Sequence, residues 1–490
     1  MIYYNRIYNL TKFVEKGLTV LIFASLFFLY FFLPLNLIIY FFCRNIKARN
    51  LILLGFSLFF YAWGEPLWVL VLIVAAFIDY MCALYIEENY GTRKAKLGLT
   101  MSLIVNLGLL AVMKYAGFFV SSLNAILPVD LPVPSIALPL GISFYTFQTL
   151  TYVVDVYRGD VEAQHSYPNY LMYLSLYPQL VAGPIVRYST VADEVEKRQS
   201  KPEDVAYGFF RFCVGLGKKV ILANTCGAIS SGFLDGNLAS LTTAGAWIGV
   251  LLYSLQIYFD FAGYSDMAIG LGRIFGFHYM ENFDYPYISK SVTEFWRRWH
   301  ISLGSFFRDY VYIPLGGNRR HEYRNLFIVW FLTGLWHGAS WNFILWGLWF
   351  GLFILLERIA LKRFFAHIPK VFSHIYLILV VVIGWVFFYF TNLGDAVTVL
   401  GRMFGVGGQF RLAPMDSSRM MNYIYFFVAA VLACLPIAPT LRKMLMRRGS
   451  RTYAPGLVVL SEIIVSVVLL LVCTSLLVGE SYNPFLYFRF

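Results

Sequence analysis

The chain has 490 residues, of which 59% are hydrophobic and only 13% charged, and its formal net charge is +12. Soluble domains carry about 25% charged residues, whereas repeated apolar runs of about 20 residues are long enough to cross a bilayer. The composition therefore excludes a soluble globular enzyme and predicts a multi-pass membrane protein. The basic residues cluster at the ends of apolar runs, which favours anionic lipid head groups over nucleic acid as their partner.

The first 90 residues are expected to form a lead-in, a long helix and a hairpin. Residues 1–15 precede an apolar run over 18–42, which is too long for the core of a signal peptide and predicts a retained helix. The next two apolar runs, 51–62 and 67–86, are separated by Trp63-Gly64-Glu65-Pro66. Glycine and proline break helices, so this pair predicts a hairpin or a broken helix.

The rest of the chain continues the same pattern. Further apolar runs lie at 98–123, 139–156, 169–182, 205–226, 244–271, 326–356, 375–391, 421–441 and 456–478. Backbone polar groups in lipid must be hydrogen bonded internally, so we expect an all-α protein with about 11 to 13 transmembrane or re-entrant helices. Residues 1–490 are expected to form a single integral membrane domain.

Basic loops set the expected orientation. Loops rich in Lys and Arg follow the runs that end near residues 42, 86, 356 and 441, and we expect these loops to be cytoplasmic. The last helix then places an aromatic tail, residues 479–490, on the extracytoplasmic side. The segment 282–325 is polar, aromatic and basic, and it predicts an amphipathic or re-entrant segment at the cytoplasmic face, with a helix over 294–310.

His337 is the strongest candidate for chemistry. It is the only ionisable residue in the apolar run 326–356, where Trp336 and Gly338 flank it. An ionisable side chain at membrane depth marks a functional site by default, and imidazole is well matched to proton transfer near neutral pH. The alternative is a structural histidine that forms hydrogen bonds between helices.

Three other polar residues lie beside apolar runs. His300 follows Phe295-Trp296-Arg297-Arg298-Trp299, and it belongs either to an interfacial basic helix or to the surroundings of His337. Asp260 and Asp266 are expected either to cap helices or pair with arginines, or alternatively to line a polar tunnel. The sequence lacks H-E-x-x-H, G-x-S-x-G and Walker A motifs, which argues against metalloprotease, serine hydrolase and ATPase activities; no metal site is expected.

Several motifs resemble the membrane-bound O-acyltransferase (MBOAT) family, and within it the bacterial branch typified by alginate O-acetyltransferases. The strongest is Thr293-Glu294-Phe295-Trp296-Arg297-Arg298-Trp299-His300-Ile301-Ser302-Leu303. The others lie at 138–147, 154–159, 178–185, 258–270, 307–310, 314–319 and 334–339. Together they cover the chain from about residue 24 to its end.

The resemblance implies an MBOAT fold around a central tunnel, in a bacterial cell membrane. It implies O-acetylation of a secreted or cell-wall polysaccharide, with His337 as the catalytic histidine and His300 as the family's second histidine. The segment 482–490 resembles an aromatic tail of polysaccharide-acylating members, in which Tyr487 would accept an acyl group as a phenolic ester. The alternative for this segment is an interfacial aromatic anchor.

The resemblance also implies a donor and partners. Acetyl-CoA is the expected acyl donor, no permanently bound cofactor is expected, and the extracytoplasmic partner is expected to be an SGNH-type acetyltransferase. The candidate ligands for the CoA phosphates are Arg297, Arg298, Arg308, Lys218 and Lys219, which otherwise serve as anchors at the cytoplasmic face. Two alternatives remain open: D-alanyl transfer to teichoic acid from a carrier-protein thioester, and a non-enzymatic role in polysaccharide export.

Overall fold

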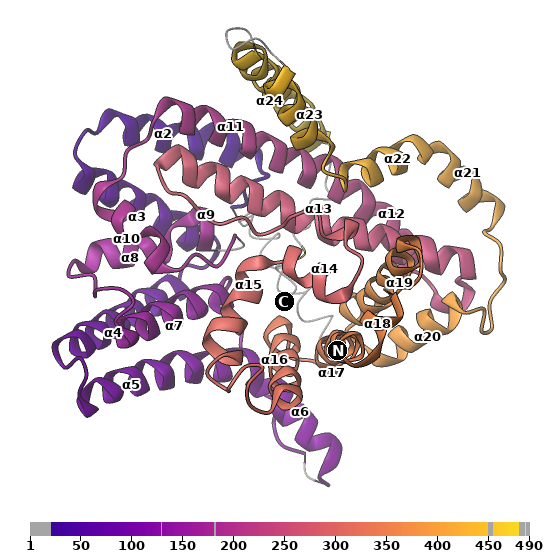
Figure 1. Cartoon of the computed structure of the whole chain (residues 1–490), viewed down its shortest axis with the longest axis horizontal. Helices are drawn as coiled ribbons and strands as arrows, with labels where there is room; N and C mark the ends of the chain where they lie inside the picture. The colour runs from indigo at the N-terminus through magenta and orange to yellow at the C-terminus, as the bar shows by residue number, and fades with distance from the viewer. Residues whose placement is uncertain are drawn as a thin grey trace. The chain divides into compact units, whose positions relative to one another are not determined.

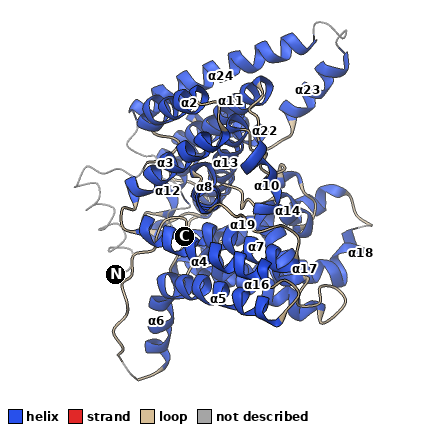
Figure 2. Cartoon of the chain, turned by 90° about the vertical axis from the view of Figure 1, so that its left-hand side faces the viewer, coloured by secondary structure: helices blue, strands red, loops and turns tan. Residues whose placement is uncertain are grey.

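The computed structural model describes residues 21–128, 130–180, 183–365, 367–448, 454–479 and 486. The expected lead-in over residues 1–15 lies outside them. Within these ranges the chain forms helices and loops and no strand (Figure 2), which confirms an all-α protein. Two compact units are distinguished, residues 1–208 with 271–279 (unit 1) and residues 209–270 with 280–490 (unit 2).

Unit 1 is built from short and long helices around the expected hairpin, which α3 and α4 form with a turn at Glu65. Its elements are η1 (Phe28–Phe32), α2 (Leu33–Phe42), α3 (Ile46–Gly64), α4 (Trp68–Glu88), α5 (Arg93–Leu110), η2 (Ala111–Tyr115), α6 (Ala116–Ile126), α7 (Ile142–Arg158), α8 (Tyr167–Ser175), α9 (Tyr177–Leu180) and α10 (Tyr188–Lys197). Two helices, α11 (Pro202–Gly217) and α13 (Thr243–Phe275), continue from one unit into the other.

Unit 2 holds the candidate catalytic residues. Its other elements are η3 (Lys218–Ala223), α12 (Asn224–Leu234), η4 (Leu238–Ser240), η5 (Pro286–Ile288), α14 (Val292–Arg298), α15 (Ile301–Phe307), η6 (Arg308–Tyr312), α16 (Glu322–His337), α17 (Trp341–Leu356), η7 (Glu357–Leu361), α18 (Lys362–Phe365), α19 (Lys370–Tyr389), α20 (Leu393–Met403), α21 (Pro414–Asn422), α22 (Ile424–Ala433), α23 (Ile437–Arg448) and α24 (Ala454–Gly479). Helix α17 packs against α16, α14 and α19 (Figure 1).

By length and composition, seven helical segments among the described residues can cross a membrane. They are Trp68–Glu88, Arg93–Ile126, Pro202–Leu234, Thr243–Phe275, Trp341–Leu361, Lys370–Tyr389 and Val458–Gly479. The bent pair Ile424–Ala433 and Ile437–Met444 is an eighth if it counts as one span. The other apolar runs form shorter helices. The expected number of 11 to 13 transmembrane or re-entrant elements counted these shorter helices as well.

The apolar run 326–356 is two helices rather than one, and the break between α16 and α17 directly follows His337. Two glycines allow these helices to pack in backbone contact. A Cβ atom on Gly334 would lie 2.4 Å from the carbonyl oxygen of Phe343, and one on Gly347 would lie 2.3 Å from that of Trp330. The packing of α16 on α17 therefore fixes the end of α16, where His337 lies.

The expected continuous helix over 294–310 is wrong, because it is interrupted at His300. Helix α14 ends at Arg298 and α15 begins at Ile301, and His300 between them has a φ of 45°. A positive φ is unfavourable for a residue with a side chain and cannot continue a right-handed helix. The backbone N–H of Ile301 donates to the carbonyl oxygen of Asn282 at 3.0 Å, which stabilises the break.

A buried carboxylate fixes the start of α14. The side chain of Glu357 accepts hydrogen bonds from the backbone N–H of Val292, and from the backbone N–H and the hydroxyl of Thr293 at 2.9 and 2.6 Å. Unpaired N–H groups at a helix N-terminus favour a negative partner. Glu357 therefore anchors the short helix that leads to His300.

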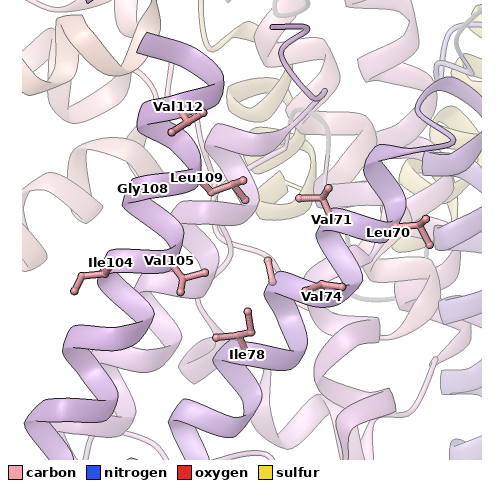
Figure 3. A pocket seen from close by; sticks show the side chains of 10 residues that line it. Leu70, Val71, Val74, Ile78, Ile104, Val105, Gly108, Leu109 and Val112 are labelled. Carbon is pink, nitrogen blue, oxygen red and sulfur yellow. The ribbon is translucent and has the colours of Figure 1, made fainter. Parts of the chain in front are cut away.

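The only pocket described for unit 1 has no polar group suited to acyl transfer. It lies between α4 and α5, has a volume of about 550 Å³ and is lined by aliphatic side chains, among them Val74, Ile78 and Ile104 (Figure 3). Both helices belong to candidate membrane spans, and Val74 and Ile104 are exposed at the surface.

Candidate active site

His300 is buried in unit 2 between polar and aromatic partners. Its side chain is 1% exposed, and its Nδ1 lies 3.2 Å from Oδ1 of Asn282. The ring of Phe261, from α13, packs edge-on against the imidazole with ring centroids 4.6 Å apart. Burial lowers the pKa of His300 to about 3, because the apolar surroundings disfavour the charged imidazolium. The side chain is therefore a neutral imidazole at physiological pH.

His337 lies at the C-terminal end of α16 inside a cage of aromatic rings. It is 4% exposed, and its ring centroid lies 4.8 Å from that of Trp336, 4.8 Å from that of Trp346 and 5.2 Å from that of Phe388. These rings come from α16, α17 and α19, so three helices hold the imidazole. An aromatic cage excludes water and restricts the ring to few orientations, as a positioned proton-transfer group requires.

The two histidines meet at one indole ring. The centroid of Trp336 lies 6.0 Å from that of His300 and 4.8 Å from that of His337. The two imidazoles are therefore no further apart than the sum of these distances, although they are 37 positions apart in the sequence. The structure thus brings together the two histidines that the sequence singled out.

Two ion pairs flank a close crossing of α11 and α13. A Cβ atom on Gly215 would lie 2.5 Å from the carbonyl oxygen of Gly263, so both positions require glycine. Next to this crossing, Lys218 lies 2.6 Å from Asp266 and Lys219 lies 2.7 Å from Asp260. Asp266 also pairs with Arg211 at 2.6 Å. Asp266 therefore pairs with an arginine, as the first of the two alternatives expected, whereas the partner of Asp260 is a lysine.

Asp260 has a second partner from the segment that follows α24. Its Oδ2 accepts a hydrogen bond from the backbone N–H of Leu486 at 2.9 Å. Leu486 is 3% exposed and belongs to the same apolar core as Trp346 and Phe388, two of the rings around His337. Tyr487 itself lies outside the described residues.

The five candidate ligands for CoA phosphates differ in their availability. Lys218 and Lys219 are paired as described, and the Lys219 side chain is only 3% exposed. Arg298 pairs with Asp284 at 2.9 Å and with Glu294 at 3.2 Å. Arg308 pairs with Asp309 at 2.6 Å, but its side chain is 64% exposed. Arg297 is exposed and makes no ion pair within the described part of the chain.

The profile of the membrane-bound O-acyltransferase family, MBOAT, matches residues 6–394. The chain belongs to this family. It is 42% identical over 395 residues to the probable alginate O-acetylase AlgI of Pseudomonas aeruginosa, covering 79% of this chain and 75% of the relative. The corresponding protein of Azotobacter vinelandii is 38% identical over 506 residues, covering 96% of this chain and all of the relative. The peptidoglycan O-acetyltransferase of Helicobacter pylori is 35% identical over 427 residues, covering 79% and 81%.

The MBOAT membership makes the protein a multi-pass membrane O-acyltransferase. Its site contains no group of three or more His, Cys, Asp or Glu side chains suited to a metal ion among the described residues. The chemistry that the two buried histidines can supply in this aromatic environment includes proton transfer and hydrogen bonding.

Sequence reasoning missed two residues that build this site. Asn282 is completely buried and contacts His300 across 18 positions, and Glu357 caps α14 across 64 positions or more. Neither residue stands in a local pattern that would reveal its role. Only the fold brings them to their partners, so no signal in the neighbouring sequence could have identified them.

Proposed function

We propose that this O-acyltransferase moves an acetyl group from a cytoplasmic thioester, acetyl-CoA, to a hydroxyl group of an extracytoplasmic polysaccharide, with His337 as general base. The observation that carries the proposal is the position of His337, caged by three rings and linked to His300 through Trp336. The names of the Pseudomonas aeruginosa and Helicobacter pylori relatives support the same chemistry, because both describe O-acetylation of a polymer.

In the proposed reaction, Nε2 or Nδ1 of His337 takes the proton of an acceptor hydroxyl as its oxygen attacks the acetyl carbonyl carbon. The carbon–sulfur bond then breaks, and the thiolate leaves with the proton that the imidazole returns. The products are an O-acetyl ester and free CoA, so atoms and charges balance. A positioned base of this kind contributes about 10²- to 10⁴-fold to the rate.

Tyr487 is proposed as the first acceptor. Its phenolic oxygen would carry the acetyl group as an aryl ester, which a sugar hydroxyl then attacks, directly or on an SGNH-type partner, and so restores the phenol. The docking of Leu486 on Asp260 supports this, because Leu486 is the preceding residue and lies in the apolar core that surrounds His337. The proposal places residues 479–490 on the extracytoplasmic side of a bacterial cell membrane.

The CoA phosphates are proposed to meet Arg297 and Arg308 first. These two guanidinium groups are exposed, although Arg308 also contacts Asp309, whereas Arg298, Lys218 and Lys219 are paired with carboxylates and less exposed. Guanidinium groups bind phosphate through paired hydrogen bonds, which suits them to a diphosphate-containing donor.

The test uses purified protein in liposomes. Radiolabelled acetyl-CoA is added outside the liposomes in one experiment and enclosed inside them in another. Acyl transfer from acetyl-CoA, lost in His337→Ala and retained in His367→Ala, supports the proposal; His367 is an exposed histidine and serves as the control. Transfer of a D-alanyl group from a charged carrier protein, with none from acetyl-CoA, would instead establish the D-alanyl alternative. If the wild-type protein transfers neither group, the assignment of acetyl-CoA as the acyl donor is wrong.

A further inference from the structure

Asn282 holds a bridging position between α13 and α15. Its Nδ2 donates to the hydroxyl of Ser265 at 3.1 Å, and its Oδ1 accepts from the backbone N–H of Ser302 at 3.2 Å and from the hydroxyl of Ser302 at 2.8 Å. The residue is 0% exposed. The carboxamide is therefore fixed from both ends.

These contacts determine which end of the carboxamide faces His300. A backbone N–H can only donate, so the atom of Asn282 that faces the N–H of Ser302 must be the oxygen. This settles the orientation of the amide by a hydrogen bond whose direction is unambiguous. The same oxygen, Oδ1, lies 3.2 Å from Nδ1 of His300.

The proton of His300 follows from this arrangement. A carboxamide oxygen only accepts hydrogen bonds, so Nδ1 of His300 must carry the hydrogen that it shares with Oδ1. The hydroxyl hydrogen of Ser302 is already directed to Oδ1, and its oxygen, 3.4 Å from Nδ1, can therefore only accept as well. A neutral imidazole with its hydrogen on Nδ1 carries a lone pair on Nε2.

Nε2 of His300 is the atom left for a ligand. It is buried and has no hydrogen-bond partner among the residues that the structure describes. A buried polar atom without a partner costs free energy in the absence of a ligand, and such atoms concentrate at functional sites. The ring lies beside Trp336, which also contacts His337, so this lone pair belongs to the same site.

We infer that Asn282 is a positioning residue that holds His300 as its Nδ1–H tautomer, so that Nε2 accepts a hydrogen bond from a donor group of the acyl acceptor other than the hydroxyl whose proton His337 takes. This inference rests on the proposed acyl transfer. It adds which ring nitrogen of the second histidine carries the hydrogen and which one accepts a hydrogen bond. In this tautomer Nε2 carries no hydrogen, so it cannot donate a hydrogen bond to the oxygen of the acetyl carbonyl. His300 therefore orients the bound acceptor and does not stabilise the developing oxyanion.

Nuclear magnetic resonance of protein labelled with ¹⁵N-histidine tests the inference without any activity measurement. The His300 signals are assigned by their loss in His300→Gln. At neutral pH we expect a protonated Nδ1 and an unprotonated Nε2 in the wild type. An Nε2–H tautomer or a doubly protonated ring would overturn the inference, whether or not the protein transfers acetyl groups.

Variants of Asn282 add a second readout. Asn282→Asp keeps an oxygen beside Nδ1 and should retain the Nδ1–H tautomer, whereas Asn282→Leu removes the acceptor and should populate the Nε2–H form. We expect Asn282→Leu to lower kcat by about 100-fold or more, with little change in KM for the donor, as wrong-tautomer variants of other enzymes do. Asn282→Leu that folds, keeps wild-type kcat and keeps the Nδ1–H signal would contradict the assignment. If Asn282→Leu does not fold, the wild-type and Asn282→Asp spectra decide.

Discussion

Leu486 donates its backbone N–H to Oδ2 of Asp260 at 2.9 Å, and this hydrogen bond joins the segment after α24 to the middle of α13. The opposite oxygen of Asp260 lies 2.7 Å from Lys219. The buried pair thus holds a piece of backbone as well as balancing two charges. On α13 the next residue, Phe261, packs on His300, so one helix supports both the docked segment and the second histidine.

Removing the acceptor at residue 260 should weaken the attachment of Leu486, which precedes Tyr487 in the sequence. Asp260→Leu alone would leave the Lys219 ammonium buried without its partner, at a cost of about 3–5 kcal/mol. The double variant Lys219→Met/Asp260→Leu removes both charges together. We expect a cysteine introduced as Ser481→Cys to react faster with a thiol reagent in this background than in the wild-type background.

The double variant Lys219→Met/Asp260→Asn is the matched control, because it also removes both charges while the amide oxygen of residue 260 can still accept from Leu486. Equal labelling rates in all three backgrounds would show that the hydrogen bond does not hold the segment.

His300 predicts a loss of stability in acid. Its folded-state pKa of about 3 lies below the ordinary value of 6.5, so between these values the unfolded chain binds a proton that the folded protein does not. Stability therefore falls as the pH decreases from 6.5 towards 3, by at most about 1.4 kcal/mol per pH unit for this one group.

Thermal unfolding in detergent at neutral pH and at about pH 5 measures this effect. The decrease should be smaller in His300→Gln, which has no imidazole to protonate. An identical decrease in both proteins would show that His300 is not held neutral by burial.

Gly347 should not tolerate a methyl group. Gly347→Ala would place a Cβ atom 2.3 Å from the carbonyl oxygen of Trp330, and backbone atoms on a neighbouring helix cannot move aside cheaply. We expect a loss of stability of about 1–3 kcal/mol and reduced acyl transfer, because the displaced α16 carries His337. Gly456→Ala in α24 is the control, because no atom lies within 4 Å of the added Cβ atom. This variant should behave as wild type. Unchanged unfolding of Gly347→Ala would contradict the close packing of α16 on α17.

The exposed arginines should affect donor binding rather than the chemical step. In Arg297→Gln and Arg308→Gln, the loss of a charged phosphate contact should raise KM for acetyl-CoA by about 10-fold each, at little change in kcat. The effect should weaken at high salt, because exposed charges are screened. Wild-type KM in the double variant would place the CoA phosphates elsewhere.

The sequence alone could predict the helical class and could single out His337 as a candidate, because both depend on local signals. Apolar runs of membrane length reveal helices, and a single imidazole within one of them is conspicuous. The break at His300 could not be predicted, because the residues of 294–310 favour a helix and the interruption depends on Asn282, which is distant in sequence. The docking of Leu486 on Asp260 spans 226 positions and likewise exists only in the folded chain.

The most direct test of the central claim is the O-acetyl content of surface polysaccharide from cells that carry the wild-type protein, His337→Ala, His367→Ala or a deletion. The account predicts that the polymer is made at normal yield in all four strains, and that its acetyl esters are lost in His337→Ala and in the deletion. Normal acetylation in His337→Ala would contradict the assignment of His337 as the catalytic base. Loss of the polymer itself in the deletion, with wild-type behaviour of His337→Ala, would identify an export component instead.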